Sequence, residues 1–241
     1  GEIAVGMNRI DLRSAKNTLA DLAYQEILRA ILAHDLKPGE RLNPLELAER
    51  MGISPTPVKH SLARLAGEGI VEFRSGLGPF LVAPTDEDIA DLFDARLMCE
   101  VYCIQQGMGH VDAAFLAEAA EHLRNCEIAF AAMDESPKAR LAFARADSGL
   151  HAHLVSLWPN RKTQSWYAQL NVHLRAGLYR EVMGEGTAYR RLEAALTAHR
   201  QIVAALERRD AATCAEVLRR HIVATKEAML SLRRELVGAR G

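Results

Sequence analysis

The segment from Asn43 to Val82 constrains the fold of this chain more than any other stretch. Asn43 is a good helix cap, Pro44 suits a first helical turn, and Gly52 ends the helix after about two turns. A second helix is expected directly afterwards, with Thr56 as its cap and Pro57 at its first position. Two short helices joined at a glycine corner predict a helix-turn-helix.

A β-hairpin is expected after the second helix. Residues 70–74 and 80–82 have the composition of strands, and Ser75 to Gly78 between them are typical of a turn. An amphipathic pattern over residues 18–32 predicts a supporting helix. This order of elements predicts a winged helix-turn-helix over residues 18–84, with one helix entering the major groove of DNA.

The rest of the chain has only helical patterning. Pro84 ends the hairpin, and Thr85 with the acidic residues behind it favours a new helix start. We expect six helices, at about 86–107, 111–133, 137–157, 161–183, 188–209 and 211–236. The predicted fold is mainly α, with an all-α six-helix antiparallel bundle over residues 85–236 for effector binding and dimerisation. Residues 1–17 are interpreted as a tag remnant or flexible start, and 237–241 as a flexible C-terminus.

The composition of the 241 residues is that of a globular protein with a formal net charge of -1. A small basic face on one domain remains compatible with DNA binding at this charge. The four cysteines form no CxxC pair, and no apolar run approaches the ~20 residues of a membrane span. We therefore expect a reduced, cytoplasmic protein that has no membrane partner.

Four residues of the helical region have the chemistry and spacing of metal ligands. Asp147 and His151 are four residues apart, so they share one helix face, and His199 and His221 fall within apolar stripes of two further helices. Three imidazoles and a carboxylate suit one divalent ion per chain, zinc or nickel in particular. The alternative for each histidine alone is a hydrogen-bonded core residue. The remaining histidines are interpreted as structural or surface residues: His34, His110, His122, His153 and His173.

Together these features resemble the GntR family of transcriptional regulators, in its FadR-type subfamily. The C-terminal part resembles the FCD ligand-sensing domain in its shorter, VanR-like version. The motifs that carry the resemblance are Pro38 to Leu42, Thr56 to Lys59, Leu65 to Val71, Arg96 with Glu100, Asp147 with His151, His199 and His221. The resemblance implies operator binding, a metal site in the bundle and a small effector.

The DNA-reading segment departs from the family pattern at several positions. The family usually has arginine where this chain has Pro55 and Lys59, and a basic wing tip where it has Leu77. Lysine reproduces the bidentate reading of guanine poorly, and proline does not reproduce it. The candidate DNA-binding residues are Thr56, Lys59, His60, Ser61, Arg64 and Arg74, with Arg41 and Arg50 as further phosphate contacts. The alternative is a solvated helix face.

Three residues are candidates for contact with the effector. Arg96 lies one turn before Glu100, so it forms either an intrahelical ion pair or a guanidinium clamp on a ligand carboxylate. The family resemblance implies an arginine on the effector side at this position. Asn171 and Arg175, again four residues apart, are weaker pocket candidates.

The sequence therefore predicts a ligand-responsive transcriptional regulator rather than an enzyme. We expect a homodimer that binds a short inverted repeat of double-stranded operator DNA, because one recognition helix covers only a few base pairs. A small organic acid bound at the metal would control operator binding. Two alternatives are a helical metalloenzyme with a His3Asp site and an architectural DNA-binding protein.

Overall fold

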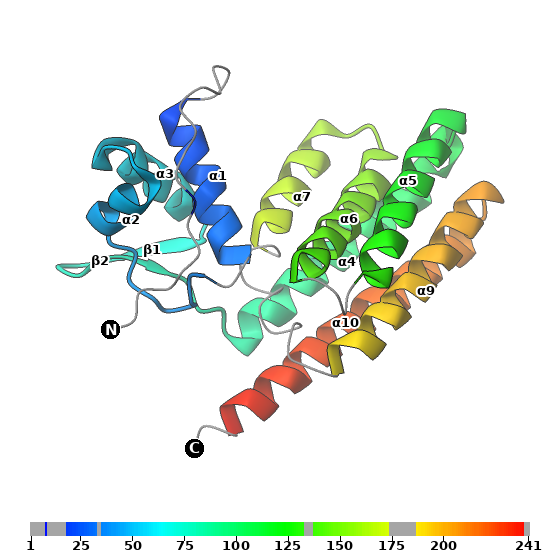
Figure 1. Ribbon diagram of the computed structural model, residues 1–241. Coiled ribbons are helices and arrows are strands. Elements are labelled where there is room, and N and C mark those ends of the chain that lie inside the picture. Colours follow the sequence, from blue (N-terminus) through cyan, green and yellow to red (C-terminus); the bar gives the residue numbers. More distant parts are fainter. Residues whose placement is uncertain (1–7, 9–17, 33–34, 133–136, 174–186, 239–241) are drawn as a thin grey trace. The chain divides into compact units, whose positions relative to one another are not determined.

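The computed structural model describes residues 8, 18–32, 35–132, 137–173 and 187–238. The chain divides into two compact units, one ending at Pro84 and the other beginning at Thr85 (Figure 1). Within the described residues, no helix is both long and apolar enough to cross a lipid bilayer.

The first unit is a winged helix-turn-helix, as the sequence predicts. Its elements are α1 (Leu19–Leu32), α2 (Pro44–Met51), α3 (Pro55–Gly67), β1 (Val71–Arg74) and β2 (Gly78–Leu81). The side chain of Asn43 accepts a hydrogen bond from the Leu45 amide, and Gly52 ends α2 with a φ of 69°. Glycine adopts this left-handed conformation without the steric cost that a side chain adds.

The start of α3 differs from the expected one. Ser54, not Thr56, occupies the N-cap position, and Pro55 is the first helical residue. Proline is favourable there because the first-turn amides have no partner within the helix. The expectation that Thr56 caps α3 was wrong.

The wing is a two-stranded antiparallel hairpin, with Val71 paired to Leu81 and Arg74 to Gly78. Arg41 adds an isolated bridge to Phe80, so the segment before α2 lies along the second strand. β2 begins at Gly78, two residues before the expected start. One apolar core joins α1, α2, α3 and the hairpin, and Ile27, Leu62 and Leu65 are almost fully buried in it.

The second unit is helical throughout its described residues. It comprises α4 (Asp86–Gly107), the 3-10 turn η1 (Met108–His110), α5 (Ala113–Ala131), α6 (Pro137–Ser156), α7 (Arg161–His173), α9 (Thr187–Glu207) and α10 (Ala211–Gly238). Thr85 and Asp88 form a reciprocal capping box at the start of α4. α5 begins two residues later than expected because Asp112 caps it. α10 extends to Gly238, beyond the expected end at 236. Residues 174–183 of the fourth expected helix lie outside the described residues.

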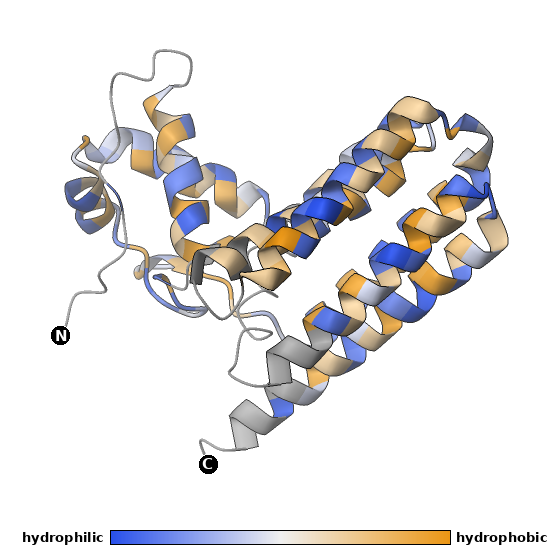
Figure 2. Cartoon of the chain, turned by 45° about the vertical axis from the view of Figure 1, so that its right-hand side comes forward, coloured by the Kyte–Doolittle hydropathy of each residue, from blue (hydrophilic) through white to orange (hydrophobic). Residues whose placement is uncertain are grey.

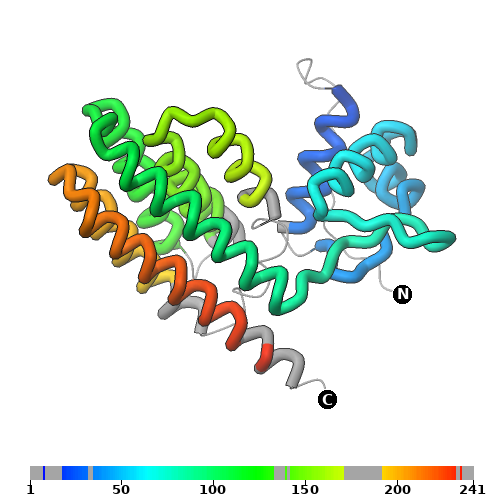
Figure 3. The backbone as a smooth tube through the Cα atoms, turned by 180° about the vertical axis from the view of Figure 1, so that it is seen from behind, coloured from blue at the N-terminus to red at the C-terminus, as the bar shows by residue number. Residues whose placement is uncertain are grey.

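Five of these helices pack as a closed series of neighbours around a shared interior. α4 packs on α6, α6 on α5, α5 on α9, α9 on α10, and α10 returns to α4. Hydrophobic and hydrophilic residues mix along each helix, as expected for elements with one buried face (Figure 2). The view from behind shows α9 and α10 running side by side (Figure 3). Side chains on the inner faces of these helices are therefore brought together from distant parts of the sequence.

Candidate metal centre and DNA-reading face

The structure brings together the four metal-ligand candidates of the helical unit. Asp147 and His151 come from α6, His199 from α9 and His221 from α10. One potential ligand atom from each residue lies within 4.8 Å of the others. Within the part of the chain that the structure describes, this is the group that meets the spacing of a metal site.

The separations between individual atoms indicate one shared focus. Nε2 of His199 lies 3.2 Å from Oδ1 of Asp147, and Nε2 of His151 lies 3.8 Å from the same oxygen. Nε2 of His151 is 3.3 Å from Nε2 of His221. The rings of His151 and His221 are stacked, whereas the ring of His199 meets both edge-on. Two imidazoles therefore approach one carboxylate oxygen of Asp147, and the third, from His221, lies beside His151 within the same group.

His199 provides a test of whether these residues fit an ion. Both of its ring nitrogens are buried, and neither makes a hydrogen bond. The 3.2 Å approach of Nε2 to Asp147 brings the two atoms close without hydrogen-bond geometry. A buried polar atom without a partner costs about 1–3 kcal/mol, and a bound cation would satisfy the lone pair. The four residues fit a divalent ion, and their nitrogen and oxygen donors suit zinc or nickel.

The electrostatics favour the metal-binding protonation states of Asp147, His199 and His221. Burial lowers the pKa of His199, and burial together with the neighbouring histidines lowers the pKa of His221 well below its ordinary value. Burial alone would raise the pKa of Asp147, but contact with His199 and the field of His151 lower it overall. Neutral His199 and His221 beside an ionised Asp147 can bind a cation without first releasing protons of their own.

A second layer of side chains orients His151. Its Nδ1 lies 2.6 Å from Oε2 of Glu100 on α4, so the Nδ1 proton is donated to that carboxylate and Nε2 is left as the ligand atom. Glu100 also accepts hydrogen bonds from the Tyr167 hydroxyl, at 2.7 Å, and from Nε of Arg96. Burial would raise the pKa of Glu100, but Arg96 and His151 outweigh it and keep the carboxylate charged.

Sequence reasoning did not assign Glu100 to the metal centre. Its spacing to Arg96 was the available signal, and of the two alternatives for Arg96 the structure shows the ion pair. Both side chains are buried, at 6% and 0% exposure. The side chain of Asn171 and the whole of Arg175 lie outside the described residues, so their effector contacts remain predictions.

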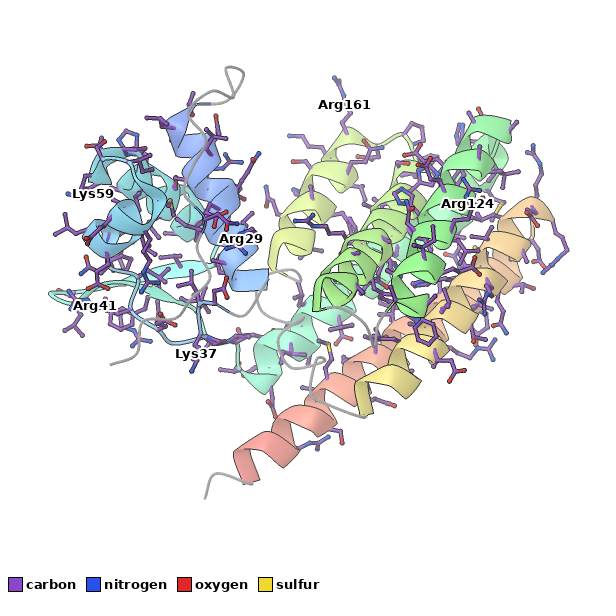
Figure 4. All side chains as sticks on the ribbon, viewed as in Figure 1. Arg29, Lys37, Arg41, Lys59, Arg124 and Arg161 are labelled. Atoms are coloured by element: carbon purple, nitrogen blue, oxygen red, sulfur yellow. The ribbon has the colours of Figure 1, made fainter. Side chains whose placement is uncertain are left out.

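The candidate DNA-binding residues form a mixed set in the winged unit. Thr56, Lys59 and His60 are exposed on α3. Lys59 and Arg41 project on the side of the unit away from α1 (Figure 4). Arg74 is exposed on the wing, where its guanidinium lies over the Phe80 ring. The remaining candidate, Arg50, is half-buried in the last turn of α2.

Two residues of α3 have roles within the domain. Ser61 is buried, and its hydroxyl lies 2.7 Å from the Ala20 carbonyl of α1, so it joins the two helices. The prediction that Ser61 contacts DNA was wrong, because its short side chain faces the core. Arg64 lies over the Tyr24 ring and forms ion pairs with Asp21 and Glu68. A partly neutralised guanidinium has less charge to offer a phosphate.

Comparison with known families assigns both units. Residues 19–81 match the family of bacterial regulatory proteins called the gntR family, and residues 91–224 match the FCD domain. Both matches agree with the fold of the corresponding unit.

Curated relatives and solved structures are similar over most of the chain. The Uxu operon transcriptional regulator of Escherichia coli is 28% identical, covering 88% of this chain and 89% of its own. A probable D-xylose utilization operon transcriptional repressor of Paenarthrobacter nicotinovorans is 24% identical over 90% of this chain and 92% of its own. The crystal structure of a GntR regulator from Rhodococcus sp. RHA1 superposes with a TM-score of 0.73 at 22% identity, covering 88% of this chain and 97% of its own.

Proposed function

The chain belongs to the GntR family of transcriptional regulators and carries an FCD domain, and on that premise we propose that a metal-bound carboxylate controls its binding to operator DNA. The winged unit would bind the operator, and Asp147, His151, His199 and His221 would hold one divalent ion. Because the family and the relatives are transcriptional regulators, the metalloenzyme alternative is set aside.

One observation carries the metal part of this proposal. The ring nitrogens of His199 are buried without hydrogen bonds at the point where three other potential ligands converge. A structural histidine in a protein core normally donates or accepts at least one hydrogen bond. The second-layer contact between His151 and Glu100 supports the same conclusion, since metal-binding histidines usually donate their other ring proton to a carboxylate or carbonyl.

The charge of the site supports an anionic effector. Asp147 and three neutral imidazoles leave a divalent ion with a net positive charge, while Arg96 and Glu100 neutralise each other. Four protein ligands also leave positions open at octahedral coordination. A small hydroxy acid, sugar acid or dicarboxylate would supply the missing charge and donor oxygens. Arg96 would affect such a ligand indirectly, through its ion pair with Glu100, or would contact the far end of the ligand directly.

The DNA part of the proposal rests on the exposed basic residues of the winged unit. Lys59 and Arg41 would supply phosphate contacts, which provide much of the affinity of such domains. We infer a homodimer on a short inverted repeat, since one recognition helix covers only a few base pairs. Met98 and Tyr102, one turn apart on α4 and 70% and 50% exposed, offer an apolar surface for the second copy.

The names of the relatives support repression of a catabolic operon as the role of this chain. One relative is described as the probable repressor of a D-xylose utilization operon, and another as the regulator of the Uxu operon. The architectural alternative predicts equal affinity for operator and random DNA. A clear preference for DNA upstream of the chain's own gene or its neighbours would exclude it.

The test is a titration of small carboxylates against the preformed complex of metal-loaded protein and operator DNA. A carboxylate that shifts the DNA affinity of wild type tenfold needs a preference of only about 1.4 kcal/mol for one dimer arrangement. The variant His199→Ala should still bind DNA but respond weakly or not at all. His110→Ala, which changes an exposed histidine of the same unit, should respond as wild type does. An equal response in both variants would place the effector elsewhere.

A further inference from the structure

Three further side chains with metal-ligand chemistry meet on the opposite side of α6 from the metal centre. Glu118 and His122 lie one turn apart on α5, and His153 lies on α6, two residues after His151. Residues two apart on a helix point in different directions, so His153 does not share the face of His151. α5 and α6 are packed neighbours, which brings the three side chains together.

The carboxylate of Glu118 is close to both imidazoles. Its Oε2 lies 3.6 Å from Nδ1 of His153, and its Oε1 lies 3.9 Å from Nε2 of His122. The ring centroids of His122 and His153 are 5.7 Å apart. The corresponding separations among the three histidines of the metal centre are 5.0, 5.2 and 5.4 Å. The ring separation in the second group is therefore only slightly larger than in the first, but its ligand atoms do not all lie within the 4.8 Å that the first group meets, so a side chain must move to close on an ion.

The contacts of His153 fix which of its nitrogens is available. Its Nε2 lies 2.9 Å from the Phe115 carbonyl oxygen, which accepts the proton of that nitrogen. The neutral ring then has its lone pair on Nδ1, the atom that faces Glu118. Stacking on the Phe115 ring, with centroids 3.9 Å apart, holds this orientation. A backbone carbonyl behind a histidine is a common second-layer partner in metal sites.

Gly149 on α6 makes room for the second imidazole. A Cβ atom at this position would lie 2.6 Å from both Nδ1 and Cε1 of His122, so any side chain would displace the ring. The Nδ1–Cε1 edge of the His122 ring lies against α6, and its Nε2 lies 3.9 Å from Glu118. Burial, and then the neighbouring His153, lower the pKa of His122 and favour its neutral, metal-binding form.

We propose that Glu118, His122 and His153 form a second divalent-metal site, separate from the metal centre and selective for a borderline ion such as zinc or nickel. Two imidazoles and a carboxylate are a known ligand set for zinc, with further positions left to water. The Glu118 side chain is 63% exposed, so it can turn to place one oxygen between the rings. A site with three ligands, one of them exposed, should bind an ion more weakly than the four ligands of the metal centre. α6 thus carries ligands for a tight ion and for a weaker ion that responds to the free metal concentration.

The test is the zinc stoichiometry of the full chain after removal of bound metal, measured by equilibrium dialysis with elemental analysis. Wild type should bind two ions per chain with distinct affinities. Glu118→Gln and His122→Gln should each lower the affinity for the second ion by about tenfold or more. Both variants should still bind the tight ion. His199→Gln should do the reverse, which separates this proposal from the one for the metal centre.

Glu121→Gln is the matched control, because it removes the same charge from an exposed position of the same helix. It should leave both ions in place. Circular dichroism of each variant checks that the helices are intact. Wild type binding a single ion would overturn the proposal. So would a second ion that survives both ligand substitutions, or one that Glu121→Gln weakens as much as Glu118→Gln does.

Discussion

The two units each contain an arginine and a glutamate four residues apart in the sequence, in different environments. In the winged unit, Nε of Arg64 lies 3.2 Å from Glu68, and the arginine side chain is 53% exposed. In the helical unit, Arg96 contacts Glu100 with the two side chains 6% and 0% exposed. The sequence pattern is the same, but water screens the first pair and is excluded from the second.

This difference extends to the functional residues of the two units. In the winged unit Lys59 and Arg41 are separate, exposed side chains, so each would contribute to DNA binding through its own phosphate contact. In the helical unit, Asp147, His151 and Glu100 share hydrogen bonds and charge, so a change in one alters the others. We therefore expect small, independent effects in the first unit and large, coupled effects in the second.

The largest effect is expected from breaking the buried ion pair. Glu100→Gln leaves the Arg96 guanidinium buried without its counter-charge, which should lower the free energy of unfolding by about 3–5 kcal/mol. Glu68→Gln removes the matching, partly exposed pair and should cost only about 0.5 kcal/mol, since glutamine still accepts from the Tyr24 hydroxyl that Glu68 binds at 2.7 Å. Urea unfolding of both variants measures the contrast. Equal losses would show that burial does not distinguish the two pairs.

Metal removal should have the next largest effect, confined to the helical unit. A ligand at 100 times its dissociation constant stabilises the folded state by about 2.7 kcal/mol, so a chelator should lower the melting temperature of wild type. In His199→Gln the chelator should lower the melting temperature much less, because only the weaker ion at Glu118, His122 and His153 is left to remove, whereas Lys59→Ala should retain the full response. If protein never exposed to chelator contains no metal, His151, His199 and His221 are core residues.

Acid should destabilise the metal-free protein through the same residues. Burial holds the pKa of His199 and His221 below 6.5 in the folded state, so the unfolded chain binds protons first as the pH falls. The stability present above pH 6.5 is therefore lost as the pH decreases through the folded pKa, by about 1.4 kcal/mol per unit for each histidine. His221→Gln should flatten this dependence in urea titrations at a series of pH values. If the pH dependence of the free energy of unfolding also decreases in His110→Gln, the effect comes from exposed histidines.

The smallest effect is expected at the recognition helix. Lys59→Ala should remove one phosphate contact and reduce the salt dependence of operator affinity by about 0.9 log units per log unit of salt. Arg64→Ala should change it less, because Arg64 is already paired with Asp21 and Glu68. Fluorescence anisotropy over a range of salt concentrations measures both slopes. Equal slopes for wild type and Lys59→Ala would remove this residue from the interface.

Local sequence signals predicted most boundaries of the fold. Asn43, Gly52 and Thr85 begin or end their helices where their side chains and backbone preferences require. The start of α3 was misplaced because two prolines and two hydroxyl residues compete within four positions, and Ser54 rather than Thr56 takes the cap. Such errors stay within one turn, since capping depends on neighbouring residues alone.

The sequence by itself determined that His199 and His221 of the candidate metal centre face inward. Helical periodicity relates a side chain to its own helix axis, so the apolar stripes around His199 and His221 identified their buried face. Only the tertiary structure decided that Glu100 orients His151, a contact between residues 51 positions apart, and that Ser61 bonds to α1. Periodicity carries no information about which helix packs opposite, because that choice depends on how all the buried faces fit together.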